Sequence, residues 1–110
     1  MTIESELYTA LSGFIDGRVY PSVAPLGTEA PYLIFIVPSK VNGDVLCGQA
    51  EKRISIQIDI YDKSLFTANE LLGDVLELLL HLELESVIEL SGYEPDTELH
   101  RATLEFSITR

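Results

Sequence analysis

The sequence predicts an α+β fold: a two-layer sandwich in which two helices pack on one face of a mainly antiparallel, four-stranded sheet, in the order α-β-β-α-β-β. Two periodic patterns lead to this prediction. Segments 53–61 and 102–109 alternate apolar and polar residues, which is typical of strands with one buried face. Segments 2–15 and 67–82 place apolar residues every three or four positions, as amphipathic helices do. Because a sheet with one apolar face needs a cover, we expect the helices to pack on it.

The first helix is predicted from Thr2 to Ile15. Its apolar residues recur on one face: Ile3, Leu7 and Leu11. Thr2 fits the N-cap position, and Gly17 is expected to end the helix because glycine readily adopts the left-handed conformation. The following segment, Val19 to Pro31, contains three prolines and Gly27, so we expect a loop there.

Three more features complete the sheet. Tyr32 to Val37 is a continuous apolar run of β-branched and aromatic residues, which predicts a central strand buried on both faces. A shorter strand is expected at about Ser86 to Leu90. Turn residues mark the segment Val41 to Glu51, which is longer than a tight hairpin needs. We therefore expect a projecting loop or hairpin there.

The second helix has two candidate starts. Thr67 and Glu70 have the spacing of a capping box, while Ser64 would start the helix one turn earlier. With either start, the leucine-rich residues cover roughly 200° of the helix, about twice the minimum apolar arc of a surface helix. The first helix or a neighbouring subunit is expected to cover the remainder, and the first helix is the preferred explanation. Gly73 would permit a close backbone approach.

Length and charge restrict the function. A chain of 110 residues is expected to form one domain, 1–110, with a net charge of −11 from eighteen acidic and seven basic residues. Between Lys63 and Arg101 there are nine acids and no Lys or Arg. Tight nucleic-acid binding needs several basic contacts to phosphate, so neither nucleic acid nor an anionic membrane is an expected partner. We also expect no signal peptide and no membrane span.

Catalytic and metal-binding motifs are not apparent. Cys47, His81 and His100 stand in no recognisable nucleophile motif. Glu94, Asp96 and Glu98 are spaced so that they could hold a weakly bound cation, but solvated turn acids explain the same residues. The sequence therefore predicts no enzyme, no cofactor and no metal site.

Several segments, in order, resemble a known family. They are 19–35 (Val-Tyr-Pro-Ser-Val-Ala-Pro-Leu-Gly-Thr-Glu-Ala-Pro-Tyr-Leu-Ile-Phe), Gly48, 53–61 (Arg-Ile-Ser-Ile-Gln-Ile-Asp-Ile-Tyr) and 68–72. Together they are similar to the small tail-completion or tail-terminator proteins of long-tailed bacteriophages and prophages.

The resemblance implies a structural role in the virion. Such proteins cap the tail tube at its head-proximal end, usually as a ring of six, after assembly in the host bacterial cytoplasm. They stop polymerisation of the tube protein and offer the surface to which the head-completion or connector protein joins. Genome DNA would then pass through the lumen without specific binding, which suits an acidic protein.

Candidate contact residues follow from exposure and charge. The segment Val41 to Glu51, with its neighbour Lys40, is expected to carry contacts because exposed loops often do, although it could equally be a simple connector. Arg18 and Arg53 are candidates for ion pairs between subunits in so acidic a chain. The full set is Arg18, Lys40, Asn42, Asp44 and Arg53. The alternative function is a small intracellular protein-binding or adaptor module with no virion role.

Overall fold

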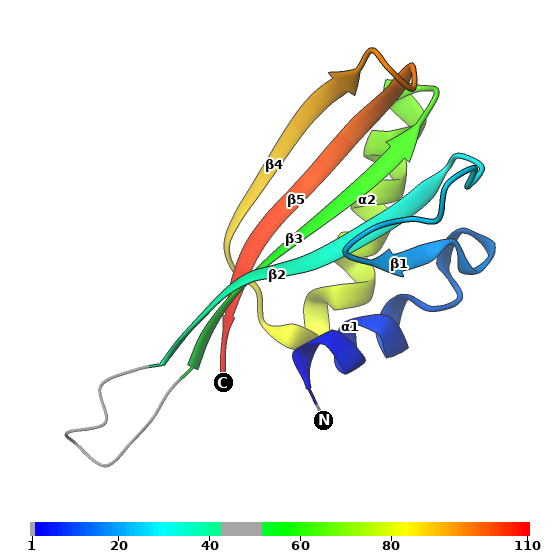
Figure 1. Cartoon of the computed structure of the whole chain (residues 1–110). Coiled ribbons are helices and arrows are strands. Elements are labelled where there is room, and N and C mark those ends of the chain that lie inside the picture. The colour runs from blue at the N-terminus through cyan, green and yellow to red at the C-terminus, as the bar shows by residue number, and fades with distance from the viewer. Residues whose placement is uncertain (1, 43–51) are drawn as a thin grey trace, which may run out of the picture.

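A computed structural model describes residues 2–42 and 52–110, with the backbone alone for residues 39, 41 and 42. Its layers are shown in Figure 1: one sheet, with both helices on the same side. The elements in order are α1 (Ile3–Leu11), η1 (Phe14–Gly17, a 3-10 helix), β1 (Val19–Pro21), β2 (Tyr32–Asn42), β3 (Lys52–Asp62), α2 (Leu65–Leu79), η2 (Leu80–Leu82, a 3-10 helix), β4 (Glu85–Glu94) and β5 (Leu99–Thr109).

The sheet has five strands in the order β1-β2-β3-β5-β4. The α+β class and the helical layer are confirmed, but the predicted four-stranded antiparallel sheet is wrong in detail. The extra strand, β1, lies in the segment expected to be a loop and runs parallel to β2. It forms because Val19 enters the core, with 2% of its surface exposed, and because Pro21 lies on the sheet edge, where a missing N–H is tolerated.

The helices begin at polar caps. The Ser5 N–H donates to Thr2 Oγ1 over 3.1 Å, which confirms the predicted cap of α1. The helix ends at Leu11, earlier than predicted, and the chain continues as the 3-10 helix η1. In α2 the Thr67 N–H donates to Ser64 Oγ over 3.3 Å, so Ser64 is the cap and the earlier of the two candidate starts is correct.

The core lies between the helices and one face of the sheet. Alternate residues of β3 point into it, as predicted from the sequence: Ile54, Ile56, Ile58 and Ile60. Alternate residues of β5 do the same: Ala102, Leu104, Phe106 and Ile108. The helices contribute Ile3, Leu7 and Leu11 from α1, and Ala68, Leu72, Val75 and Leu79 from α2. This one-sided burial places the opposite face of the sheet, here called the open face, away from both helices.

The continuous apolar run in β2 is covered on one face only. Leu33 and Phe35 are buried, whereas Tyr32, Ile34 and Ile36 are half-buried on the open face. The prediction of burial on both faces is therefore wrong for the isolated chain, because both helices pack on the same side of the sheet. Three large side chains of β2 are left only partly covered.

The apolar arc of α2 is wider than its contacts within the chain. Phe66 and Leu78, on α2, and Leu80, which follows its last turn, are 74%, 42% and 63% exposed. Among the described residues of the chain, nothing lies within 4 Å of the position that a Cβ on Gly73 would occupy, so α1 makes no close backbone approach there. The described residues thus cover the apolar surface of α2 only in part.

Among the described residues no helix has the length and hydropathy needed to cross a membrane.

Most of the expected projecting loop lies outside the described residues. Residues 43–51, which include Asp44 and Cys47, are not described. The strands on either side, β2 and β3, pair as far as Asn42 and Lys52.

We expect Leu104→Ala to lower the free energy of unfolding by about 2–5 kcal/mol, because Leu104 is fully buried on the interior strand β5 and its truncation leaves a cavity. Chemical denaturation followed by circular dichroism measures this change. The control is Leu26→Ala, at a fully exposed leucine, which should change stability by no more than about 0.5 kcal/mol. Equal effects of the two substitutions would contradict the core described above.

Gly73→Ala should instead raise the free energy of unfolding by about 0.5–1 kcal/mol, since Gly73 lies inside α2 with open space where the methyl group would go. Gly17→Ala serves as the opposite control, because Gly17 has φ +83 and alanine would be strained there. Thermal denaturation of both variants tests the pair. A destabilised Gly73→Ala chain would mean that this face of α2 is packed against something.

Candidate interaction surface

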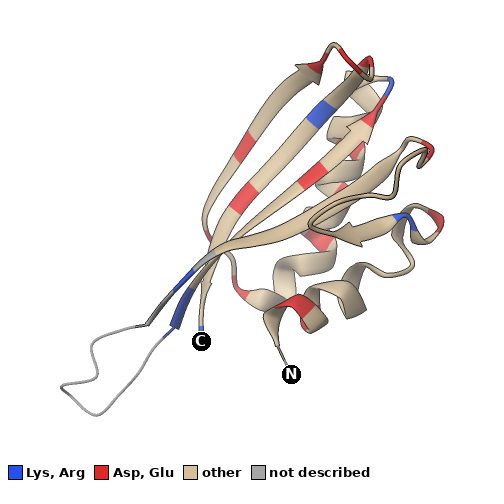
Figure 2. Ribbon diagram, viewed as in Figure 1, with Lys and Arg blue, Asp and Glu red and all other residues tan. Residues whose placement is uncertain are grey.

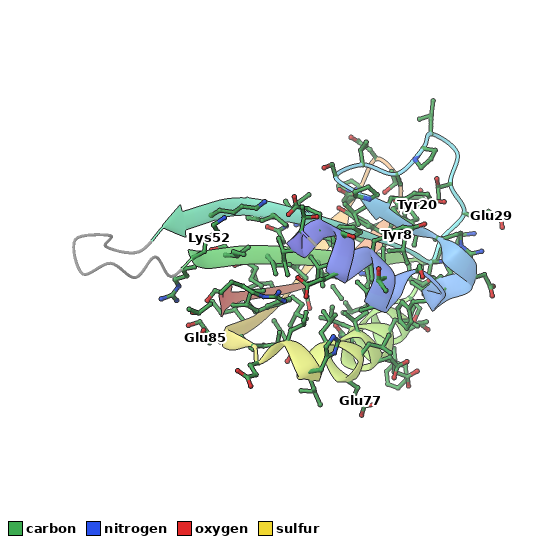
Figure 3. The ribbon with its side chains drawn as sticks, turned by 90° about the horizontal axis from the view of Figure 1, so that it is seen from below. Tyr8, Tyr20, Glu29, Lys52, Glu77 and Glu85 are labelled. Atoms are coloured by element: carbon green, nitrogen blue, oxygen red, sulfur yellow. The ribbon has the colours of Figure 1, made fainter. Side chains whose placement is uncertain are left out.

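Four of the seven basic residues gather at one end of the sheet, here called the cationic end. They come from the end of β2, the start of β3 and the residue after β5, where Figure 2 shows the basic positions in blue: Lys40, Lys52, Arg53 and Arg110. Pairing brings them together, because the Lys52 N–H donates to the Arg110 carbonyl over 2.6 Å and the Arg110 N–H donates back over 2.7 Å. Figure 3 shows Lys52 at this end of the sheet and Glu29 at the opposite end.

Two of these basic side chains bind acids of α1. Lys40 Nζ lies 3.0 Å from Glu4 Oε1, and Arg110 Nη1 lies 2.7 Å from Glu6 Oε2. The hydrogen bond from Lys40 lowers the pKa of Glu4. Both pairs are at the surface, so each contributes little stability, but they orient the basic groups. A groove of about 400 Å³ lies between them, lined by Thr2, Ile3, Glu6, Lys40, Lys52, Ile54 and Arg110.

The structure brings together only part of the predicted contact set. Lys40, Asn42 and Arg53 meet at the cationic end, where Asn42 pairs with Lys52 in the β2–β3 register. Arg53 is exposed and its Nη2 donates to Ser107 Oγ over 3.3 Å. Arg18 lies elsewhere: its Nε donates to the Pro31 carbonyl over 2.9 Å, which ties the start of β1 to the end of the loop before β2. Asp44 lies outside the described residues.

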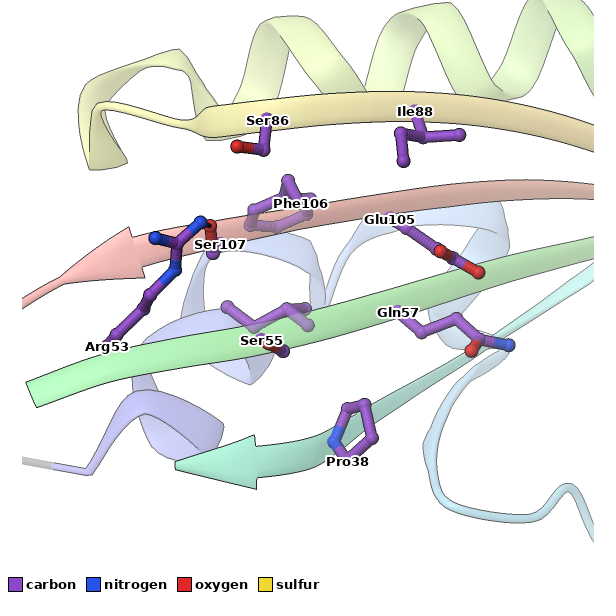
Figure 4. A pocket seen from close by; sticks show the side chains of 10 residues that line it. Pro38, Arg53, Ser55, Gln57, Ser86, Ile88, Glu105, Phe106 and Ser107 are labelled. Atoms are coloured by element: carbon purple, nitrogen blue, oxygen red, sulfur yellow. Dashed lines mark hydrogen bonds between the residues drawn. The ribbon is translucent and has the colours of Figure 1, made fainter. Parts of the chain in front are cut away.

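The open face has apolar residues at its two lateral edges and polar residues between them. Residues directly opposite each other on paired strands share a face, so the register defines two rows across the sheet. One row runs Ile34, Asp59, Thr103, Leu90 and the next runs Ile36, Gln57, Glu105, Ile88. Each row starts and ends with a branched apolar side chain. Figure 4 shows part of this face, where a shallow depression of about 260 Å³ crosses β2, β3, β5 and β4, from Pro38 to Ser86.

The polar centre of the open face is hydrogen-bonded. Asp59 is 7% exposed, and its carboxylate accepts hydrogen bonds from Thr103 Oγ1 and from Gln57 Nε2, the latter over 3.0 Å. Burying this acid further would require a cationic partner. The centre of the face is therefore suited to water, in contrast to its edges.

Aromatic residues stack at the end of this face away from the cationic end. The rings of Tyr32 and Tyr61 stack with centroids 5.0 Å apart. Burial raises the pKa of Tyr61, and the negative charges of Asp59 and Glu94 raise it further. A hydrogen bond from Arg101 lowers this pKa in part. Both phenols thus stay protonated at neutral pH, since burial also raises the pKa of Tyr32.

The described residues contain no group of three or more His, Cys, Asp or Glu side chains placed to hold a metal ion. The acids Glu94, Asp96 and Glu98 lie in and beside the turn between β4 and β5, as solvated turn acids do. His100 packs against Tyr93, with ring centroids 4.8 Å apart. Cys47 lies outside the described residues.

Two features of this surface were missed from the sequence. Arg110 and Glu6 are 104 positions apart, and no local pattern indicates that they pair. The strand β4 is twice the predicted length, because its edge position lets polar and apolar residues follow one another without regular alternation. The adjacent Lys52 and Arg53 were the only local signal of the cationic end.

Comparisons with known proteins give a family and a similar solved structure. A family model described as tail completion protein gp17 matches residues 6–109. No curated protein matches the chain. Among solved structures, a chain from the virion of a native gene transfer agent particle matches with a TM-score of 0.69 and 16% identity, over 97% of this chain and 92% of that one. At that identity the likeness shows a shared fold.

The family match spans nearly the whole chain and confirms the resemblance found in the sequence. The chain belongs to the tail completion protein gp17 family and is a structural protein of a bacteriophage tail.

Proposed function

We propose that this protein ends the tail tube as a ring of copies. The ring would stop polymerisation of the tube protein and present the surface to which the head-completion or connector protein joins. Family membership over residues 6–109 is the observation that carries this proposal. The partly uncovered apolar residues of β2 and β4 support it, because exposed apolar surface is typical of a subunit that associates with others.

The proposed site of action is the head-proximal end of the tail in the virion, reached after assembly in the bacterial cytoplasm. We propose that the chain acts there as one domain, with six copies in the ring, and without catalysis or a cofactor. Its partners would be further copies of itself, the tail tube protein and the head-completion protein.

Genome DNA is proposed to pass through the lumen without specific binding. The acid-rich segment from Glu70 to Glu98 spans the outer surface of α2 and the strand β4, and it carries no Lys or Arg. Such a surface repels the DNA backbone. A structure of the assembled ring that placed this segment on the outer rim would contradict this role.

For contacts with the partner proteins, we propose the cationic end together with the segment that follows β2. Lys40, Asn42 and Arg53 lie where residues 43–51, with Asp44, leave and rejoin the sheet. Arg18, at the start of β1, and Arg53, near the start of β3, remain the candidates for ion pairs between subunits.

Deleting the gene in the parent phage or prophage should give overlong or headless tails, because nothing then stops the tube or joins it to the head. Electron microscopy of the lysate scores tail length and head attachment. Supplying the wild-type gene in trans should restore normal virions. Normal virions without the gene would reject the proposal and favour the adaptor function instead.

Reversing a charge at the cationic end should weaken assembly. We expect Arg53→Glu to reduce the binding of purified protein to tails from the deletion lysate by about tenfold or more, since a reversed interfacial charge meets like charge on its partner. Co-sedimentation with the tails measures the bound fraction. Lys63→Glu, at an exposed lysine between β3 and α2, is the matched control. If the two variants bind equally, Arg53 does not lie in the contact.

A further inference from the structure

We propose that the β4 edge of one copy packs against the β1–β2 edge of a second copy, so that the two sheets lie side by side. The inference deepens the proposed function and rests on it, since it names the contact between neighbouring copies in the ring. It is carried by the rows of residues across the open face, by the exposure of β4 and by the charges of the two edges.

The rows show which parts of the open face are suited to contact. Each row has apolar side chains at its two ends, on β2 and on β4, and hydrogen-bonding or charged side chains in between. A partner lying across the whole face would bury Glu105, which is half-buried, and would remove the last exposed part of Asp59, which is costly without cations to pair with them. Partners at the two edges bury only the apolar ends and leave the polar centre in water.

The strand β4 is an exposed edge strand of the sheet. It pairs with β5 alone, and from Glu85 to Ser91 every residue is exposed. Four large apolar side chains on it are about half exposed: Val87 at 44%, Ile88 at 50%, Leu90 at 49% and Tyr93 at 52%. They lie on both faces of the strand, and no helix among the described residues covers them. A long apolar edge of this kind favours contact with another sheet edge.

The opposite edge offers matching surface. The strand β1 pairs only with the stretch Leu33 to Phe35, so the lower half of β2 has no strand on its outer side among the described residues. Ile36 begins that half, and Tyr20 on β1 extends the row that contains Ile34. This edge therefore also presents partly covered apolar side chains from its open-face side.

Charge selects the pairing between unlike edges. The strand β4 carries Glu85, Glu89 and Glu94 and no base, whereas Lys40 is the single charged residue of β1 and β2. Two β4 edges in contact would bring several glutamates together and repel each other. A β4 edge against a β1–β2 edge avoids this repulsion, because the one charged residue of β1 and β2 is Lys40, which also pairs with Glu4 of its own chain. Because this contact joins different surfaces, it repeats from copy to copy and closes into a ring when the rotation allows.

The test uses one variant blocked at each edge. Ile88→Lys/Leu90→Lys places two charges in the β4 edge, and Ile36→Lys places one in the β1–β2 edge. Sedimentation velocity over a concentration series should show the wild type assembling beyond a dimer, with each variant weakened by about tenfold or more. Phe66→Lys, on the exposed surface of α2, is the matched control and should assemble like the wild type.

Mixing the two edge variants gives the sharpest result. Each variant keeps one intact edge, so an equimolar mixture should form dimers of one copy of each and nothing larger. If the Ile36→Lys chain assembles alone, or if the mixture stays monomeric while the wild type assembles, the proposed contact is wrong. A thermal melt checks that the Ile36→Lys chain is folded, and Tyr20→Lys replaces it if it is not.

If the free wild-type chain does not self-associate, the same variants are scored as copies retained per tail, on tails from the deletion lysate. Retention of either edge variant at the wild-type number would overturn the contact. The two proposals fail separately. Defective tails on gene deletion together with edge variants that assemble normally would leave the function standing and reject the edges. Normal virions together with mixed dimers would reject the function and keep the edge contact.

Discussion

The strands β3 and β5 pair along their whole length and bury the same face of the sheet under α2. Eight alternating apolar side chains on these two strands form the centre of the core, and every other element is placed by reference to them. The helix α1 packs beside α2 and below β1, and β2 and β4 add to the outer sides of the central pair. Removing this one-sided burial would leave the helices without a surface to cover.

Because both helices pack on the same face of the sheet, the opposite face remains uncovered by helices in the described part of the chain. Two helices of 9 and 15 residues cover one face, and nothing in the described residues covers the other. The open face therefore has to tolerate water, and its centre does so through the hydrogen bonds between Asp59, Thr103 and Gln57. Only its edges retain apolar side chains. In a protein that assembles with its neighbours, such edges are suited to contact, since their apolar side chains are only partly covered within the chain.

Charge is distributed unevenly by the fold. The chain carries a net charge of −11, yet the ends of β2 and β5 and the start of β3 bring four basic residues to one end of the sheet. Two of them are held by acids of α1, so the N-terminal helix both covers the core and orients the basic groups. The outer surface of α2 and the edge strand β4 remain acidic. A partner at the cationic end therefore meets basic residues, whereas a partner at α2 or β4 meets acidic residues.

Whether a feature of the fold or surface could be predicted from the sequence depends on how far apart in the chain the interacting residues are. The alternation in β3 and β5, the apolar spacing of both helices and their caps at Thr2 and Ser64 are local patterns, because burial of a strand or helix face repeats along the chain itself. They determined the α+β class and the helix-covered sheet, and the ordered segments that carry the family resemblance are local too.

The tertiary structure decided three other features: the strand β1, the pairing of Arg110 with Glu6 and the uncovered face of β2. Each depends on residues far apart in the chain: the parallel pairing of Val19 with Leu33, the meeting of the two termini, and the packing of both helices on one side. A strand's own residues specify which of its faces is apolar, whereas the elements that pack on it decide which face is covered.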